Sequence, residues 1–470
     1  MSEDCKAPTP GSRQTVPVTD ENSETPLHPL WGEQTRLAVD NFPVSGEPMP
    51  LSVIRAVAAI KQAAAVVNAR LGVLDPETAA EIAAAAADIA AGRYPEQFPI
   101  DVFQTGSGTS TNMNVNEVIA TLASARLGAD VHPNDHVNAS QSSNDVMPTA
   151  VHIAVLRSLL AGLLPALNRL QLALTEQAGR HAGTVTLGRT HLMDAVPLTI
   201  GDEFSGWAAQ IAHGIERIES AIARVAEVPL GGTAVGTGLN TPRGWRDAVV
   251  TELGSTSGLA LSPARNAFEA QSARDALVEM SGQLRTVAVS LTKISEDIRW
   301  KASGPAGGLG EFALPALQAG SSIMPGKVNP VIPEVVVQVA AQVVGNDAAV
   351  AWAGARGAFE LNAMIPVIAR NLLSSINLLT SASRLLADRC VAGIEVDQHR
   401  TRALAESSAA LITALNPYLG YTEAAAIVKE ASRSGRSVRE LAERHIPDRL
   451  SRRQLDEALD LDRIARPHQA

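Results

Sequence analysis

The chain has 470 residues, of which 46% are hydrophobic and only 3% aromatic, and its formal net charge is −10. Because no block of Lys or Arg stands out in this acidic chain, we expect neither a nucleic acid nor an anionic membrane surface as a partner. We also expect no membrane span, since we find no run of about 18 strongly apolar residues. The two cysteines, Cys5 and Cys390, form no paired framework, which favours a reducing cytoplasm.

Three helical domains are predicted after a polar tail. The tail, residues 1–27, is rich in Pro, Ser, Thr and acidic residues, which indicates a flexible segment. Asp75, Pro76 and Glu77 provide an N-cap, an N1 proline and a first-turn acid, and so predict an Ala-rich helix that ends near residue 91. We place domain boundaries near 143 and 366. This division gives an N-terminal helical domain (28–142), a central domain of long helices (143–366) and a small C-terminal helical domain (367–470).

Long helices with regular apolar seams dominate the centre of the chain. Apolar residues recur every three or four positions from 204 to 225 and from 277 to 298. Apolar stretches at 150–178, 334–352 and 362–386 predict further helices. Helices of this length are unusual in a globular monomer. The predicted fold class is therefore all-α, with a long central bundle that other subunits complete.

Two of the polar stretches that interrupt the helices carry hydroxyls and amides. Residues 105–109 read Thr-Gly-Ser-Gly-Thr, and such a turn at a helix start suits a carboxylate or phosphate, although a plain helix cap is the alternative. In the second stretch, capping needs only one of Ser142, Ser143 and Asn144, so the surplus favours ligand binding. Upstream, His132 and Asp135 lack the spacing of a zinc site, and we expect no metal there.

The third stretch, Gly188 to His191, precedes the seam that begins at Phe204. Histidine titrates near neutral pH and suits general acid–base work, although a lone histidine near a helix start is usually structural. Glu334, much later in the chain, is the residue we expect to orient and charge His191.

The fourth stretch is the loop 320–330, which reads Gly-Ser-Ser-Ile-Met-Pro-Gly-Lys-Val-Asn-Pro. Its glycines and prolines allow a loop that is mobile and still reaches one defined shape. It carries a possible proton-transfer group, Ser321 or Ser322, and an anion-binding pair, Lys327 and Asn329. A surface turn is the plainer interpretation, but this loop lies between two apolar helical segments, where sites tend to occur.

These four stretches, in this order, resemble the fumarase/aspartase superfamily of homotetrameric lyases, and most closely its class II fumarases. The resemblance extends from Leu30 to about residue 440 and rests on TGSGTSTNMN, SQSSND, GRTH, GGTAVGTGLN, GSSIMPGKVNP and Phe-Glu-Leu-Asn at 359–362. It implies a three-domain all-α fold, a homotetramer in which three subunits contribute to each active site, and no cofactor.

The resemblance also implies roles, position by position. Ser321 would remove a proton from C3 of malate, and His191, charged through Glu334, would activate water or protonate the departing hydroxyl. The implied substrate contacts are Ser107, Gly108, Thr109, Ser142, Ser143, Asn144, Thr190, Ser322, Lys327, Val328 and Asn329. A second, peripheral dicarboxylate site is implied at His132, Pro133, Asn134 and Asp135, next to His136, which replaces the usual aspartate.

The implied activity is the reversible hydration of fumarate to (S)-malate in the tricarboxylic acid cycle, through an aci-carboxylate intermediate. Fixed N–H groups, amides and Lys327 could stabilise the added negative charge, each by about 10²–10³ in rate. Three alternatives stay open. Aspartate ammonia-lyase shares the scaffold but usually has alanine where this chain has Gly326. Related lyases that release fumarate from argininosuccinate or adenylosuccinate have bulkier or basic residues after Met-Pro. A catalytically silent structural relative would not need the intact motifs.

Overall fold

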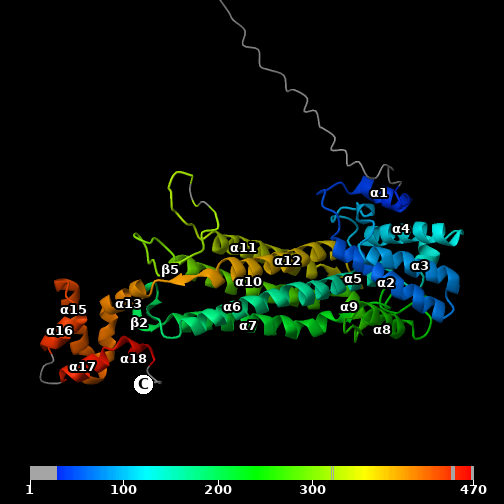
Figure 1. Cartoon of the computed structure of the whole chain (residues 1–470). Helices are drawn as coiled ribbons and strands as arrows, with labels where there is room; N and C mark the ends of the chain where they lie inside the picture. Colours follow the sequence, from blue (N-terminus) through cyan, green and yellow to red (C-terminus); the bar gives the residue numbers. More distant parts are fainter. Residues whose placement is uncertain (1–28, 319, 321, 446–449, 467–470) are drawn as a thin grey trace, which may run out of the picture.

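A long bundle of helices joins groups of shorter helices at its two ends (Figure 1). The structure, a computed structural model, describes residues 29–318, 320, 322–445 and 450–466. The predicted flexible tail and Ser321 lie outside the described residues. The all-α prediction is confirmed, because the strands are short and the long elements are all helical.

Short helices form the end of the molecule at the right of Figure 1. The side chain of Asp75 accepts a hydrogen bond from the backbone N–H of Thr78 (3.0 Å), which confirms the predicted cap. The α8 helix packs on α2, so a segment after residue 240 returns to this end. The elements here are α1 (Glu33–Asn41), α2 (Leu51–Arg70), α3 (Pro76–Ala90), η1 (Pro95–Gln97), α4 (Thr109–Leu127), η2 (Pro133–Val137), α8 (Trp245–Ser257) and α9 (Ala267–Ser272).

The bundle helices close into a ring. The α6 helix packs on α7, α7 on α10, α10 on α11, α11 on α12, and α12 on α6. Every apolar residue of the seam predicted from Leu277 to Ile298 is buried inside it. The bundle elements are α5 (Ser143–Ser158), η3 (Leu159–Leu163), α6 (Leu164–Arg180), α7 (Ile200–Val225), α10 (Asp275–Lys301), α11 (Val331–Gly354) and α12 (Ile365–Arg389).

The first bundle rod is continuous from α5 through η3 into α6. Pro165 falls in the first turn of α6, where a proline is tolerated. The rod covers 38 residues, Ser143 to Arg180. At about 1.5 Å per residue it extends over roughly 55 Å. The residues just before the rod and those just after it therefore lie at opposite ends of the helix bundle.

The C-terminal helices share a second apolar core, which also contains Val185 and Leu187. These helices are α13 (Gln398–Ser407), η5 (Ala409–Leu415), α14 (Asn416–Leu419), α15 (Tyr421–Ser434), α16 (Val438–His445), α17 (Arg452–Ala458) and α18 (Leu461–Ala465). The short helix η4 (Val391–Gly393) instead packs on α6 and α12, and Val391 belongs to the main core. The division of the chain near 143 and 366 stays a prediction.

One β-hairpin interrupts the helices, and the sequence did not predict it. The antiparallel strands β1 (Val185–Thr190) and β2 (Met193–Thr199) pair with a register shift between Leu187 and Arg189. His191, which we expected near a helix start, lies at the tip of this hairpin. The other strands have two residues each: β3 (Glu227–Val228) with β4 (Ser262–Pro263), β5 (Phe312–Ala313) with β8 (Glu395–Val396), and β6 (Gly357–Ala358) with β7 (Leu361–Asn362).

Three helical segments are long and apolar enough to cross a membrane by length and composition alone: Leu51–Arg70, Ser143–Arg180 and Val331–Gly354. Alanine-rich and valine-rich helices reach the same mean hydropathy as a membrane span, so length and composition do not distinguish the two, and the expectation of no membrane span stays a prediction. Within the chain, 72%, 67% and 33% of the respective apolar windows are buried. Two thirds of the apolar window of α11 is thus exposed or only half-buried within the chain.

Candidate active site

Two helix N-termini meet in a patch of hydroxyls. Thr109 is the first residue of α4, and Ser143 is the first residue of α5. The Thr109 hydroxyl lies 2.7 Å from the Ser107 hydroxyl and 2.7 Å from the Ser143 hydroxyl, in one continuous chain. Helix N-termini carry partial positive charge and free N–H groups. This hydroxyl patch is therefore suited to hold an anion such as a carboxylate.

The backbone geometry requires glycine at two positions beside the patch. A Cβ atom on Gly106 would lie 1.9 Å from the carbonyl oxygen of Ala363, and the Gly106 carbonyl accepts a hydrogen bond from the N–H of Ile365 (3.0 Å). Gly108 has a φ of +75°, which side chains rarely adopt. The turn of the hydroxyl patch is thus fixed against the start of α12.

Residues 142–145 cap α5 and also bind the segment 231–234. Ser142 caps α5 in a capping box with Asp145. The buried Asp145 carboxylate also accepts the N–H groups of Gly231 and Thr233, each at 2.9 Å. Burial raises the pKa of Asp145 despite these bonds. Asn144 donates to the carbonyl of Ala234 (2.9 Å), so the segment 231–234 is tied to the start of α5.

The hairpin tip presents Thr190 and His191 to the outside of the chain. Both residues are exposed, and His191 and Leu192 have φ values of 57° and 59°. Two-residue hairpin turns with positive φ normally favour Asn and Gly, so a His-Leu pair is held there at some cost. Leu192 is 71% exposed and Met193 is 70% exposed. The tip therefore projects an imidazole among uncovered apolar side chains.

The loop before α11 is closed at its base and open at its outer part. A Cβ atom on Gly320 would lie 2.0 Å from the carbonyl oxygen of Lys327, so only glycine fits there. The Asn329 amide donates to the Gly320 carbonyl (2.6 Å) and holds the two ends of the loop together. Ser322, Lys327 and Val328 are exposed.

The predicted site residues fall into separate groups. The hydroxyl patch lies at the α4 end of the molecule, whereas the hairpin and the loop lie at the other end (Figure 1). Glu334 lies in the first turn of α11. Among the described residues, no hydrogen bond or ion pair joins Glu334 to His191 within the chain. One chain alone therefore does not bring its predicted site residues together.

Comparison with known proteins decides the family. A family model described as lyase matches residues 21–345, and a model of the fumarase C C-terminus matches residues 411–466. The class II fumarate hydratase of Mycobacterium tuberculosis is 56% identical, with 94% of each chain covered. The chain belongs to the class II fumarate hydratase family.

Further relatives agree with this assignment. The class II fumarate hydratase of Corynebacterium glutamicum is 51% identical over 93% of each chain. The crystal structure of recombinant class II fumarase from Schistosoma mansoni superposes with a TM-score of 0.92 at 37% identity, and it covers 94% of this chain and 97% of that one. The family resemblance drawn from the sequence motifs is confirmed.

In this member of the class II fumarate hydratase family, the residues predicted for a peripheral dicarboxylate site form a small turn. The His132 ring accepts the N–H of Asp135 (3.1 Å), and the His136 ring accepts the N–H of His132 (2.9 Å). The turn spans Pro133–Val137 and therefore includes Asn134. Binding of a second dicarboxylate stays a prediction. Over the described part of the chain, no group of three or more His, Cys, Asp or Glu residues is placed to hold a metal ion.

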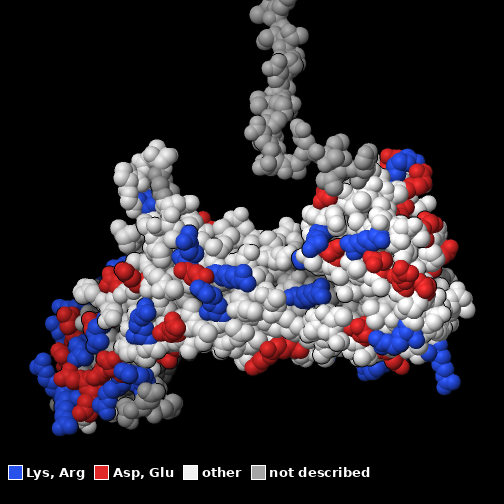
Figure 2. Space-filling view, turned by 45° about the vertical axis from the view of Figure 1, so that its right-hand side comes forward, with Lys and Arg blue, Asp and Glu red and all other residues white. Residues whose placement is uncertain are grey.

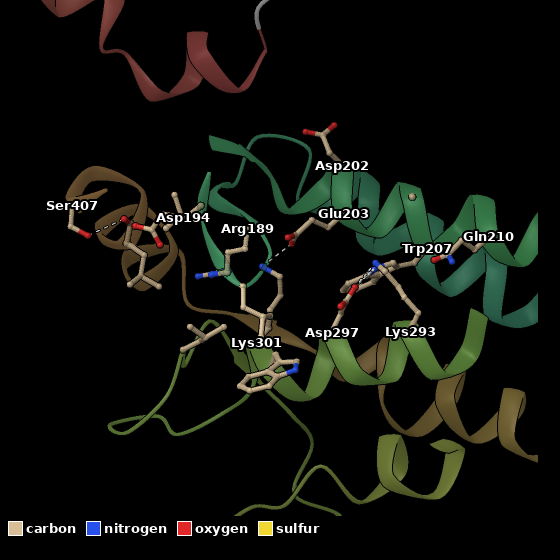
Figure 3. Close-up of a pocket in the computed structure, with 16 residues that line it drawn as sticks. Arg189, Asp194, Asp202, Glu203, Trp207, Gln210, Lys293, Asp297, Lys301 and Ser407 are labelled. Carbon is tan, nitrogen blue, oxygen red and sulfur yellow. Dashed lines mark hydrogen bonds and ion pairs between the residues drawn. The ribbon is translucent and has the colours of Figure 1, made fainter. Parts of the chain in front are cut away.

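Sequence reasoning missed a buried ion network beneath the hairpin. Glu311 is fully buried and binds Arg189 (2.9 Å) and Lys301 (3.2 Å), and Lys301 also contacts Glu203 (2.8 Å). Arg189 and Lys301 border a cavity of about 760 Å³ (Figure 3). Arg189 and Glu311 are separated by 122 residues, so no local pattern could have indicated their contact.

Proposed function

We propose that the chain catalyses the reversible hydration of fumarate to (S)-malate without a cofactor, at sites assembled from several copies of the chain. The observation that carries this proposal is the hydroxyl patch, where Ser107, Thr109 and Ser143 are joined at two helix N-termini. Neutral donors at helix N-termini bind a carboxylate without a competing negative charge. This local attraction matters because the chain carries a net charge of −10.

In the proposed reaction, water adds across the double bond of fumarate. In the reverse direction, Ser321, as its oxyanion, takes the proton from C3 of malate and becomes a hydroxyl, and the electron pair moves into the adjacent carboxylate to give the aci-carboxylate. The C2–OH bond then breaks, and His191 gives a proton to the departing hydroxyl, which leaves as water. Ser142, Asn144, Thr190 and Lys327 are proposed to hold the carboxylates and the hydroxyl. Each such fixed donor contributes about 10²–10³ in rate.

Assembly from several copies is supported by distance. The hydroxyl patch precedes the rod from Ser143 to Arg180, and His191 follows it. The ends of this rod are about 55 Å apart at 1.5 Å per residue, so a C4 substrate cannot touch both in one chain. The exposed tip around His191 is then expected to enter the patch end of a neighbouring subunit, with the loop 320–330 supplied by another.

The surface supports a homotetramer as the assembled form. Figure 2 shows dense mixed charge at the C-terminal end, whereas the bundle between the two ends is largely uncharged in this view. On α11, Val344 is 45% exposed and Trp352 is 65% exposed. Apolar surface of this extent on a long helix is typical of a face that a partner covers.

We also propose a cytoplasmic location. Cys390 is a free, buried cysteine, and burial raises the pKa of its thiol to about 12. A thiol that stays protonated reacts slowly, and this supports a structural role for the cysteine in a reducing compartment.

One assay tests the activity directly. Purified protein is incubated with (S)-malate and, separately, with aspartate, and the ultraviolet absorbance of the fumarate formed is followed. We expect turnover of malate and none of aspartate. Turnover of aspartate alone would instead support an ammonia-lyase. Absence of both activities in an assembled, folded sample would support a silent structural relative.

A further inference from the structure

The carboxylate of Glu311 is the centre of a network that connects separate parts of the chain. It accepts hydrogen bonds from the Thr186 hydroxyl (2.7 Å) and from Arg189 (2.9 Å), both on β1. Lys301, at the end of α10, contacts the same carboxylate at 3.2 Å. Burial alone would raise the pKa of Glu311, but Lys301, Thr186 and Arg189 outweigh burial and lower it. Glu311 is thus held as a carboxylate.

The backbone of Glu311 is fixed as well as its side chain. Its N–H donates to the carbonyl of Lys301 (2.8 Å), and its carbonyl accepts the N–H of Asp397 (3.0 Å). The residue next to it, Phe312, begins β5 and is buried. The carboxylate therefore has a defined position, from which it can set the position of the hairpin.

The hairpin needs such an anchor near its tip. Among the strands that the structure describes, β1 and β2 pair only with each other, and a two-stranded hairpin is marginally stable in isolation. Its base is anchored by Val185 and Leu187 in the C-terminal core. Arg189 follows the register shift, and it lies one residue before Thr190 and two before His191. Through Arg189, Glu311 therefore anchors the hairpin two residues before the proposed catalytic histidine.

The cavity shows that packing does not hold this face of the hairpin. A space of about 760 Å³ lies beside Arg189, Asp194 and Lys301. Figure 3 shows Arg189 and Lys301 next to each other at this space, with Lys301 reaching Glu203. A buried ion network gives little stability compared with apolar packing. Its role here is then better explained by orientation of the hairpin than by stability.

From this arrangement we propose that Glu311 is a positioning residue, held by Lys301, which acts through Thr186 and Arg189 to fix the hairpin that presents Thr190 and His191 to the active site. This inference rests on the proposed function. A displaced imidazole would be slow in proton transfer, whereas the hydroxyl patch of the neighbouring subunit would still bind the substrate carboxylate. The network should therefore affect kcat much more than KM.

The test compares Glu311→Gln with Glu203→Gln. Both variants remove a carboxylate that contacts Lys301, but of the two, Glu311 alone accepts hydrogen bonds from β1. We expect Glu311→Gln to lower kcat for malate by about 10- to 100-fold, as misplacement of a reacting group by about 1 Å does. KM should change by less than about twofold, and Glu203→Gln should lower kcat by a much smaller factor. Light scattering should show the wild-type oligomer for both variants.

A double variant, in which Glu311→Gln is combined with His191→Ala, separates this inference from the proposed function. If Glu311 acts through His191, Glu311→Gln should cause no further loss of kcat in a His191→Ala chain, since effects that act through one group are not additive. Additive losses, or an unchanged kcat in the single Glu311→Gln variant, would overturn the positioning role. A His191→Ala chain with the full wild-type rate would instead overturn the catalytic role of His191.

Arg189→Met provides the same test if Glu311→Gln fails to assemble. This variant removes the arm on the hairpin and leaves Glu311 paired with Lys301 and Thr186. We expect a comparable loss of kcat. Wild-type kcat in an assembled Arg189→Met variant would contradict the proposal.

Discussion

The two ends of the molecule are organised in different ways. At the α4 end, Ser107, Thr109 and Ser143 are joined to one another within a single chain, and backbone contacts fix the turn around them. At the opposite end, His191 and Lys327 are exposed, and the imidazole stands on a turn with positive φ. The first end is joined within one chain, whereas in our proposal the second depends on the network of Glu311 and on a neighbouring subunit.

The largest effect should come from the exposed end. His191→Ala removes the proposed proton donor, and general acid–base catalysis typically contributes 10²–10⁴ in rate. We therefore expect kcat for malate to fall by about this factor while the oligomer stays intact, measured by steady-state kinetics and light scattering. His399→Gln, an exposed histidine on α13, is the matched control and should keep the wild-type rate. Equal rates for His191→Ala and the control would show that the exposed end performs no chemistry.

A smaller and different effect is expected at the α4 end. Ser143→Ala removes one hydroxyl of the patch and leaves the α5 cap, Ser142, in place. A hydrogen bond to a charged group is worth about 1.5–3 kcal/mol, so KM for malate should rise by roughly 10- to 100-fold. Ser110→Ala is the control, because Ser110 bonds Thr105 outside the patch. If Ser143→Ala changed only kcat, the assignment of binding to this end and proton transfer to the other would be wrong.

The smallest effect concerns the bundle that separates the two ends. His152 is buried, and burial lowers the pKa of its ring to about 4, although the ring bonds the Val225 carbonyl (2.7 Å). Between pH 6.5 and about 4 the unfolded chain binds a proton that the folded chain does not, so the free energy of unfolding falls as pH falls. The His152 ring alone lowers the free energy of unfolding by about 3 kcal/mol over that pH range.

His152→Gln should therefore flatten the decline of Tm between pH 6.5 and 4, measured by thermal unfolding at one protein concentration. His399→Gln should leave the decline unchanged. Identical slopes for the two variants would indicate that the buried imidazole does not set the acid sensitivity of the bundle.

The fold could be predicted largely from local patterns. The seam from Leu277 to Ile298 and the cap at Asp75 follow from spacing and residue type alone, and both are confirmed. The hairpin was missed because its alternation is short and its turn, His191-Leu192, lacks the usual Asn or Gly. Apolar helix composition could not decide between a bundle core and a membrane span, since both share it.

The site was predictable as a set of motifs but not as a geometry. Ser142 to Asn144 stood out because they exceed what one helix cap requires. The Arg189–Glu311 contact joins residues 122 positions apart, and no periodicity reports such a pair. Among the described residues no hydrogen bond or ion pair joins Glu334 to His191, so their proposed partnership would need a neighbouring subunit and stays a prediction.

The continuous rod from Ser143 to Arg180 has a consequence for genetic complementation between mutant alleles. Because it keeps the two ends of one polypeptide apart, a chain damaged only at His191 still supplies an intact hydroxyl patch, and a chain damaged only at Ser143 still supplies an intact histidine. Two inactive alleles of these kinds, expressed in one cell, should restore activity to each other in mixed oligomers. Two alleles damaged at the same end should not.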